Sequence, residues 1–175
     1  MIIARQQRRK NIAEYILYMW QVEDIIRAYG FDMQLIESNI VNRYDQPEKV
    51  KAEIRQWYAD LIEMMRLERI EKTGHLQIVK NSVFDLFDLH LRLLDDFDKV
   101  YIALYRRAEP YIRELEIKQG GIVKNEIEVC LNALYGKLLL KLRQKEITPD
   151  TQEALDNISK MLAYLAKRYH ENESR

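Results

Sequence analysis

The sequence predicts an all-α protein of five or six helices, packed mainly antiparallel with one long kinked helix as the centre. Three observations support this prediction. One apolar stripe keeps helical phase from Leu76 to Leu115, in steps of three and four residues that share one helix face. The 175 residues include only five Gly and three Pro, which is little material for a fold with many turns. Helix caps and early prolines stand where helices are expected to begin.

Composition favours one domain over residues 1–175, with a basic start at 1–10 and a frayed tail at 171–175. Apolar residues make up 47% of the chain and charged residues 32%, as in folded proteins rich in amphipathic helices. The charges balance at 28 basic and 28 acidic residues, which argues against a dedicated nucleic-acid or membrane-surface domain. No apolar run approaches the roughly 18 residues of a membrane span.

The single cysteine, Cys130, excludes an internal disulfide. It lies among apolar residues of an expected helix, so we expect it to be a buried hydrophobe and not a reactive thiol. No signal-peptide pattern follows Met1, because the apolar start is short and precedes the basic cluster. These features predict a cytoplasmic protein.

The first helix is expected over residues 5–29, because Gly30 suits the left-handed position that ends many helices. Asp32 would cap a short helix over 33–42. The third helix would begin at Asp45-Gln46-Pro47-Glu48, which combines an acidic cap, an early proline and a glutamate, and would end at Thr73-Gly74. Its inward residues are expected to be Val50, Ile54, Trp57, Leu61 and Met64.

The long stripe comprises Leu76, Val79, Val83, Phe87, His90, Leu94, Phe97, Tyr101, Tyr105, Ala108, Ile112 and Leu115. An unbroken helix of that length would span about 60 Å, so we expect a bend. Pro110 is the favoured point because proline removes a backbone donor and clashes with the preceding turn. The stretch Asp95-Asp96-Phe97-Asp98 is the second candidate. Since the phase survives both points, the sequence favours one kinked helix.

Two further helices complete the prediction. Gly120-Gly121 is expected to turn the chain before a helix over 123–145. Thr148-Pro149 would open the last helix by a cap followed by a proline. Its buried face is expected to consist of Leu155, Ile158, Leu162, Leu165 and Tyr169.

The helix expected over 123–145 has two apolar faces. The second face carries small residues and consists of Val129, Ala133, Gly136 and Leu140. A helical glycine costs about 1 kcal/mol relative to alanine, so tight packing at Gly136 would compensate. Either this helix is covered on both sides within one chain, or the second face is a symmetric dimer contact.

Polar residues on apolar faces are the candidate ligand site. Glu23 lies in the stripe of the first helix beside Trp20, and a buried carboxylate needs a partner. Arg27, four residues on, is the simplest one. His90 lies equally centrally in the long stripe. If Glu23 and His90 meet in the core, they would form a polar pair of the kind found at functional sites.

Metal and cofactor sites are not expected. None of His75, His90 and His170 has Glu three residues before it, as di-metal bundles require. The acidic residues Asp85, Asp88, Asp95 and Asp96 alternate with basic ones and are expected to face solvent. The sequence contains no Gly-rich phosphate loop, no Cys-x-x-Cys and no Gly-x-Ser-x-Gly, so enzyme chemistry has no local motif.

The basic run at the start includes Arg5, Arg8 and Arg9. On a continuous helix these residues would extend the face of Ile12 and Ile16, where arginines oppose the helix dipole. They would either overhang the core in solvent or meet an acidic partner, such as another protein or a nucleic acid. With few charges and no interleaved aromatic residues, nucleic-acid binding is the weaker expectation.

The run Asn-Ile-Ala-Glu-Tyr-Ile-Leu-Tyr-Met-Trp-Gln-Val-Glu-Asp, residues 11–24, resembles the start of a family of small all-helical bacterial proteins classed as a domain of unknown function. The resemblance implies a bacterial helical protein and assigns no functional residues.

The sequence thus predicts first a non-enzymatic interaction or scaffold protein that forms a homodimer and contacts a further protein partner. A small-molecule or metal-binding bundle with a site at Trp20, Glu23 and His90 is the second hypothesis. Weak nucleic-acid binding through Arg5, Arg8 and Arg9 is the third.

Overall fold

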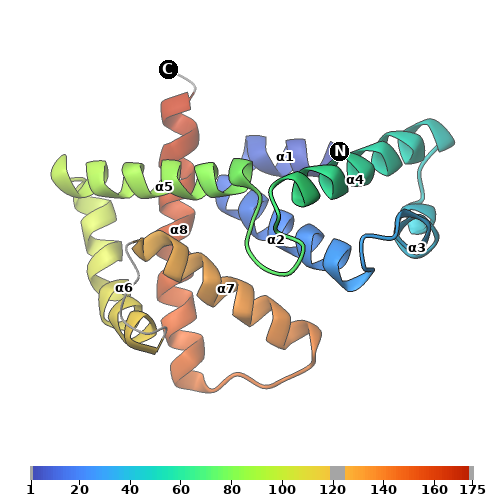
Figure 1. Cartoon of the computed structure of the whole chain (residues 1–175). Helices are drawn as coiled ribbons and strands as arrows, with labels where there is room; N and C mark the ends of the chain where they lie inside the picture. The colour runs from blue at the N-terminus through green and yellow to red at the C-terminus, as the bar shows by residue number, and fades with distance from the viewer. Residues whose placement is uncertain (1, 119–124, 174–175) are drawn as a thin grey trace.

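The computed structural model describes residues 2–118 and 125–173, and this part of the chain is helical without strands (Figure 1). It contains eight α-helices, so the expected number of five or six is wrong. They are α1 (Ile2–Lys10), α2 (Ile12–Ala28), α3 (Met33–Asn39), α4 (Glu48–Leu67), α5 (Gln77–Asp95), α6 (Lys99–Lys118), α7 (Glu126–Leu142) and α8 (Pro149–Glu173). A short 3₁₀ helix, η1 (Val41–Arg43), follows α3.

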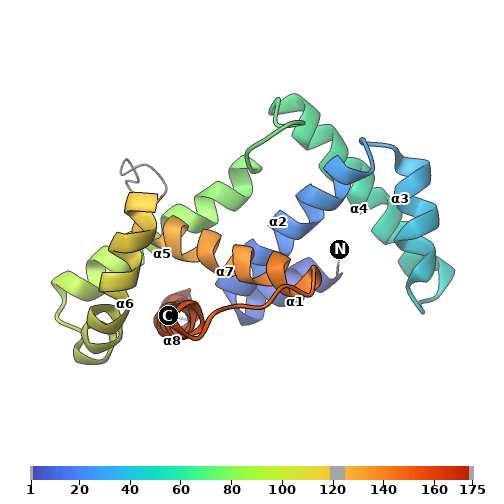
Figure 2. The same ribbon diagram turned by 90° about the horizontal axis from the view of Figure 1, so that it is seen from below.

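Helix α8 is the element that most of the others surround. It contacts α2, α5, α6 and α7, and α5 crosses it while α6 runs alongside it (Figure 1). The segment that begins at Leu76, expected to be central, contacts α2, α7 and α8. Helices α3 and α4 pack against each other and against η1, and they lie at the end of the molecule away from α6 (Figure 2).

The chain breaks at Asn11, where a continuous helix over 5–29 was expected. Asn11 is extended, with φ −158°, and its side-chain oxygen accepts the N–H groups of Ala13 and Glu14 as the N-cap of α2. The Ile12 N–H donates to His170 Nε2 of α8 at 3.1 Å. An asparagine cap with an outside partner for the next N–H favours two helices over one. Arg8, Arg9 and Lys10 of α1 are exposed and therefore do not extend the buried face of α2.

The predicted kinked helix is likewise two helices, separated by Asp96–Asp98. Phe97 has a φ of +54°, the left-handed conformation that ends helices, and the Asp98 N–H donates back to the Leu93 carbonyl. The Asp98 side chain then accepts the N–H groups of Val100 and Tyr101 and starts α6. Pro110, the favoured break, lies inside α6. The cap at Asp98 therefore makes α6 a separate helix from α5, although the apolar pattern of the sequence keeps its helical phase across this point.

Helix α4 ends at Leu67, before the expected stop at Thr73-Gly74. Arg69 and Gly74 both have positive φ, +56° and +96°, so residues 68–76 form an irregular loop. Ile54 and Leu61 of α4 are buried as expected, whereas Val50, Trp57 and Met64 are only half-buried. Tyr58 and Met65 are fully buried and complete the inward face of α4. This loop carries His75 toward α2.

Other local expectations are confirmed. Asp32 caps α3 through its side chain, Cys130 is fully buried, and burial raises the pKa of its thiol. The acidic residues Asp85, Asp88, Asp95 and Asp96 are exposed. The predicted face of α8 is buried at Leu155, Ile158, Leu162 and Leu165 and half-buried at Tyr169. The tail expected to fray from Glu171 is still helical to Glu173, and the Gly120-Gly121 turn lies outside the described residues.

Candidate functional site

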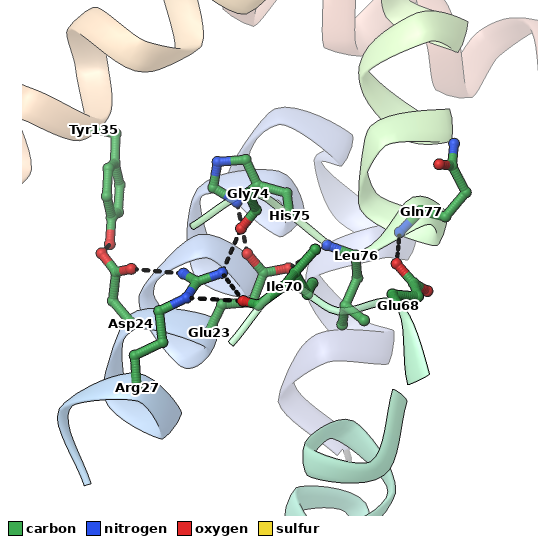
Figure 3. A network of polar contacts seen from close by, with 10 residues as sticks. All are labelled: Glu23, Asp24, Arg27, Glu68, Ile70, Gly74, His75, Leu76, Gln77 and Tyr135. Atoms are coloured by element: carbon green, nitrogen blue, oxygen red, sulfur yellow. Dashed lines mark hydrogen bonds and ion pairs between the residues drawn. The ribbon is translucent and has the colours of Figure 1, made fainter. Parts of the chain in front are cut away.

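Glu23 of α2 is completely buried, and it pairs with the loop that precedes α5. Its Oε2 lies 2.6 Å from His75 Nδ1, and its Oε1 accepts the N–H of Leu76 at 3.0 Å (Figure 3). With an ionised carboxylate, the Nδ1 proton of the imidazole donates to Glu23, so both oxygens are satisfied. The expected pairing with Arg27 is therefore wrong.

Arg27 instead holds the loop backbone. Its guanidinium donates to the carbonyls of Ile70 and Gly74 and forms an ion pair with Asp24 at 3.0 Å. The other Asp24 oxygen accepts the Tyr135 hydroxyl of α7 at 2.6 Å (Figure 3). Burial and this bond to Asp24 raise the pKa of Tyr135. Residues from α2, α7 and the 68–76 loop are thereby fixed relative to one another.

Trp20, one turn before Glu23 on α2, packs on the same histidine. The rings of Trp20 and His75 stack at 4.5 Å between centroids, and Tyr135 meets the indole edge-on at 5.6 Å. Beside this stack lies a cavity of about 180 Å³, which we call the Trp20 cavity. It is lined by Trp20, Gly74, His75, Lys80, Val83, Phe84, Asn125 and Glu128.

Two side chains of the Trp20 cavity carry buried donors without a partner. Trp20 is 1% exposed and Asn125 is 5% exposed. Trp20 Nε1 and Asn125 Nδ2 are the only buried side-chain nitrogen or oxygen atoms of the described residues that make no hydrogen bond. An unpaired buried donor costs about 1–3 kcal/mol, and each such group calls for an explanation. That both line one cavity suggests that the missing acceptors belong to a ligand.

His90 belongs to a different polar cluster, so the hypothesis that it meets Glu23 is not supported. His90 Nδ1 lies 2.6 Å from the Tyr101 hydroxyl, and its Nε2 lies 3.7 Å from a carboxylate oxygen of Glu126. Tyr105 donates to the same Glu126 oxygen at 2.8 Å. Burial lowers the pKa of His90 to about 4, so the ring is neutral near pH 7. This cluster joins α5, α6 and α7.

The second face of α7 is covered at one end only. Val129 is fully buried, whereas Ala133 and Gly136 are half-buried and Leu140 is 39% exposed. A Cβ atom at Gly136 would meet nothing within 4 Å. The tight packing that we expected at Gly136 is therefore not made by the described part of this chain.

The basic start gives no comparable site. Arg8 and Arg9 are exposed, and the Arg8 guanidinium lies 5.9 Å from the centre of the Tyr15 ring. The side chain of Arg5 lies outside the described residues.

A broader depression of about 640 Å³ lies between Lys10, Asn11 and the end of α8, but none of its described lining residues has an unpaired buried polar group. The larger volume therefore carries less evidence for a ligand than the Trp20 cavity.

Among residues 2–118 and 125–173, no group of three or more His, Cys, Asp or Glu side chains is arranged to hold a metal ion. Within the same ranges, no helix is both long and apolar enough to cross a membrane.

The comparisons with known proteins bear on the chain as a whole. Residues 1–175 match the family described as a domain of unknown function, DUF4924. The chain belongs to this family. Comparison of this DUF4924 chain with curated proteins and with solved structures gives no match. The resemblance at residues 11–24 therefore extends to the full length, and the site must be interpreted from its own geometry.

Sequence reasoning found Trp20 and Glu23 but missed His75, Lys80, Phe84 and Asn125. Asn125 directly precedes the acidic first turn of α7, which is an N-cap pattern that could have been recognised. His75 follows Gly74 in an irregular loop, where no periodicity indicates its direction.

Proposed function

We propose that this protein binds a small molecule in the Trp20 cavity. The observation that carries the proposal is the pair of unpaired buried donors on Trp20 and Asn125, both of which line the same cavity. Its volume of about 180 Å³ is comparable to that of an engineered apolar cavity of about 150 Å³ that binds benzene. The expected ligand is therefore the size of a single ring with a few attached atoms.

Binding rather than catalysis fits the residues around the cavity. His75 is oriented by a carboxylate, as a catalytic base often is. Its described neighbours in the lining, however, include no serine, threonine or cysteine that it could activate. The site therefore corresponds to the second sequence-based hypothesis, a small-molecule-binding bundle, with His75 in the place assigned to His90.

The proposal is tested with the two indole N–H signals of the ¹⁵N-labelled protein, which come from Trp20 and Trp57. Trp57 does not line the cavity and is the internal reference. Titration with single-ring molecules should move the Trp20 signal and leave the Trp57 signal in place. Val83→Phe, which fills the cavity, should abolish the response, whereas Val100→Phe at an exposed site should keep it. If folded wild-type protein shows no response to neutral, anionic or cationic rings, the proposal is wrong.

Homodimer formation is a second candidate function, favoured by the open face at Gly136. Gly136 is half-buried, and a Cβ at this position would meet no atom of the described residues within 4 Å, which permits the close approach of another helix. A second copy supplies the same small-residue face. Ala133 and Leu140 extend this surface along α7. Such a dimer, packed as an antiparallel bundle, would also provide a scaffold for a protein partner.

Sedimentation of untagged protein tests this second candidate. The dimer should dissociate in Gly136→Leu while helix content is unchanged, and Asn132→Leu, on an exposed part of α7, should have no effect. A monomer at all concentrations would exclude it.

Contact of the basic start with nucleic acid stays a prediction, tested by salt-sensitive binding that weakens when Arg8 and Arg9 are neutralised. A bacterial, cytoplasmic location is likewise a proposal, supported by the resemblance at residues 11–24 and the single buried cysteine.

A further inference from the structure

The unpaired groups around the Trp20 cavity are both donors. Trp20 Nε1 has no acceptor, and the Asn125 amide uses its oxygen to cap α7 while its nitrogen has no partner. No buried acceptor among the described side chains is left unpaired. The cavity therefore requires hydrogen-bond acceptors from its occupant, and a ligand with only donors would leave both nitrogens unsatisfied.

The charged residues of the lining favour an anion at this position. Lys80 is half-buried and has no ion pair within the described part of the chain. Glu128 also lines the cavity, but it is exposed, so solvent screens its repulsion of an anion more strongly. The buried Glu23 carboxylate is occupied by His75 and the Leu76 N–H, and it is not left to attract a cation.

The remaining walls are apolar or aromatic. Val83 is buried, Phe84 is 54% exposed, and the stacked rings of Trp20 and His75 form a flat surface. The two unpaired nitrogens are shielded from solvent, so an acceptor reaches them only when neighbouring side chains move by the small amounts that commonly accompany binding.

We propose that the Trp20 cavity selects a small carboxylate with a compact apolar body, such as a single-ring aromatic acid. This inference rests on the proposed function, because it names the class of ligand for the same cavity. The carboxylate oxygens accept from Trp20 Nε1 and Asn125 Nδ2, Lys80 balances the charge, and the ring packs against Val83 and Phe84. Charge-assisted hydrogen bonds of this kind are about twice as strong as neutral ones.

Three probes of similar size distinguish the claim that the cavity binds a small molecule from the claim that it selects a carboxylate. They are benzoate, toluene and benzylamine. Titrations of the full chain are followed by calorimetry and by the indole N–H signals. Benzoate should bind about tenfold or more tightly than either other probe, because only it supplies acceptors and negative charge. The Trp20 indole N–H signal should move downfield with benzoate, as expected for a donor that gains an acceptor, while the Trp57 signal stays.

Lys80→Met should weaken benzoate binding several-fold and leave toluene binding nearly unchanged. Lys49→Met, which removes the same charge at an exposed site of α4, is the control and should bind benzoate as the wild type does. Toluene or benzylamine affinity equal to that of benzoate, or unchanged benzoate affinity in Lys80→Met, overturns the carboxylate inference and leaves the cavity as a ligand site. If none of the three probes moves the Trp20 signal, the proposed function itself fails.

Discussion

Glu23 and His75 lie 52 positions apart in the chain, and their Oε2 and Nδ1 atoms are 2.6 Å apart. The carboxylate comes from the middle of α2 and the imidazole from the loop between α4 and α5. Because Trp20 stacks on the same imidazole, this contact joins the loop, whose backbone Arg27 holds, to the aromatic wall of the Trp20 cavity. It is the structural link between the core of the molecule and its candidate site.

Glu23→Gln should lower the free energy of unfolding by about 1–3 kcal/mol, because it replaces charge-assisted hydrogen bonds in the core by neutral ones. Urea unfolding at pH 7 measures the change. Glu63→Gln, at an exposed position of α4, is the matched control and should change stability by less than about 0.5 kcal/mol. Equal stability of the two variants would contradict the assignment of Glu23 as a buried, paired carboxylate.

His90 should make the protein less stable in acid. Its pKa is about 4 in the folded protein against an ordinary value of 6.5, so between these values the unfolded chain binds more protons. The stabilisation is complete above pH 6.5 and is lost as the pH falls toward 4, by an amount on the order of 1–3 kcal/mol.

The His90 contribution is measured by comparison of urea unfolding at pH 7 and pH 4.5 in the wild type and in His90→Gln, which keeps a polar group beside Tyr101. Burial raises the pKa of the neighbouring Glu126, which acts in the opposite sense, so the difference between the two proteins is the informative quantity. If the free energy of unfolding changed equally with pH in the wild type and in His90→Gln, this would show that His90 is not held neutral.

Phe97→Gly should raise the free energy of unfolding by about 0.5–1 kcal/mol. Phe97 has a φ of +54° and is 78% exposed, so it adopts a conformation that favours glycine and buries little apolar surface. Thermal or urea unfolding measures the gain. A loss of stability would indicate that the Phe97 ring makes contacts that offset its backbone conformation.

Gly136→Ala should raise the helix content and stability of the isolated chain by up to about 1 kcal/mol, since alanine is the better helix former and the added methyl group has open space. If a second copy packs closely at this position, the same change should weaken the dimer. Unfolding of dilute protein reports the first effect and sedimentation of concentrated protein reports the second. A destabilised monomer would show that Gly136 is packed within its own chain.

Periodicity predicted the helical class and most of the buried face of α8, because one residue per turn must face the core whatever the helix packs against. It failed at Asn11 and at Asp96–Asp98 for a common reason. At both places a capping side chain starts a new helix without disturbing the apolar phase, so the pattern alone does not distinguish one kinked helix from two.

The site was predictable only in part. The position of Glu23 on an apolar face required a partner for its buried carboxylate, and this was correct. The partner itself comes from an irregular loop whose direction is set by Arg27, through its bonds to the Ile70 and Gly74 carbonyls. Such long-range contacts produce no regular spacing of residues in the sequence. Arg27, four residues after Glu23 on the same helix, was therefore favoured as the partner instead.

The most direct test of the central claim is a crystal structure of the protein soaked with benzoate. We predict density for one molecule in the Trp20 cavity, with its carboxylate within hydrogen-bond distance of Trp20 Nε1 and Asn125 Nδ2 and its ring against Val83. A cavity without ligand at saturating benzoate, with both nitrogens bonded to groups of the protein, would contradict it.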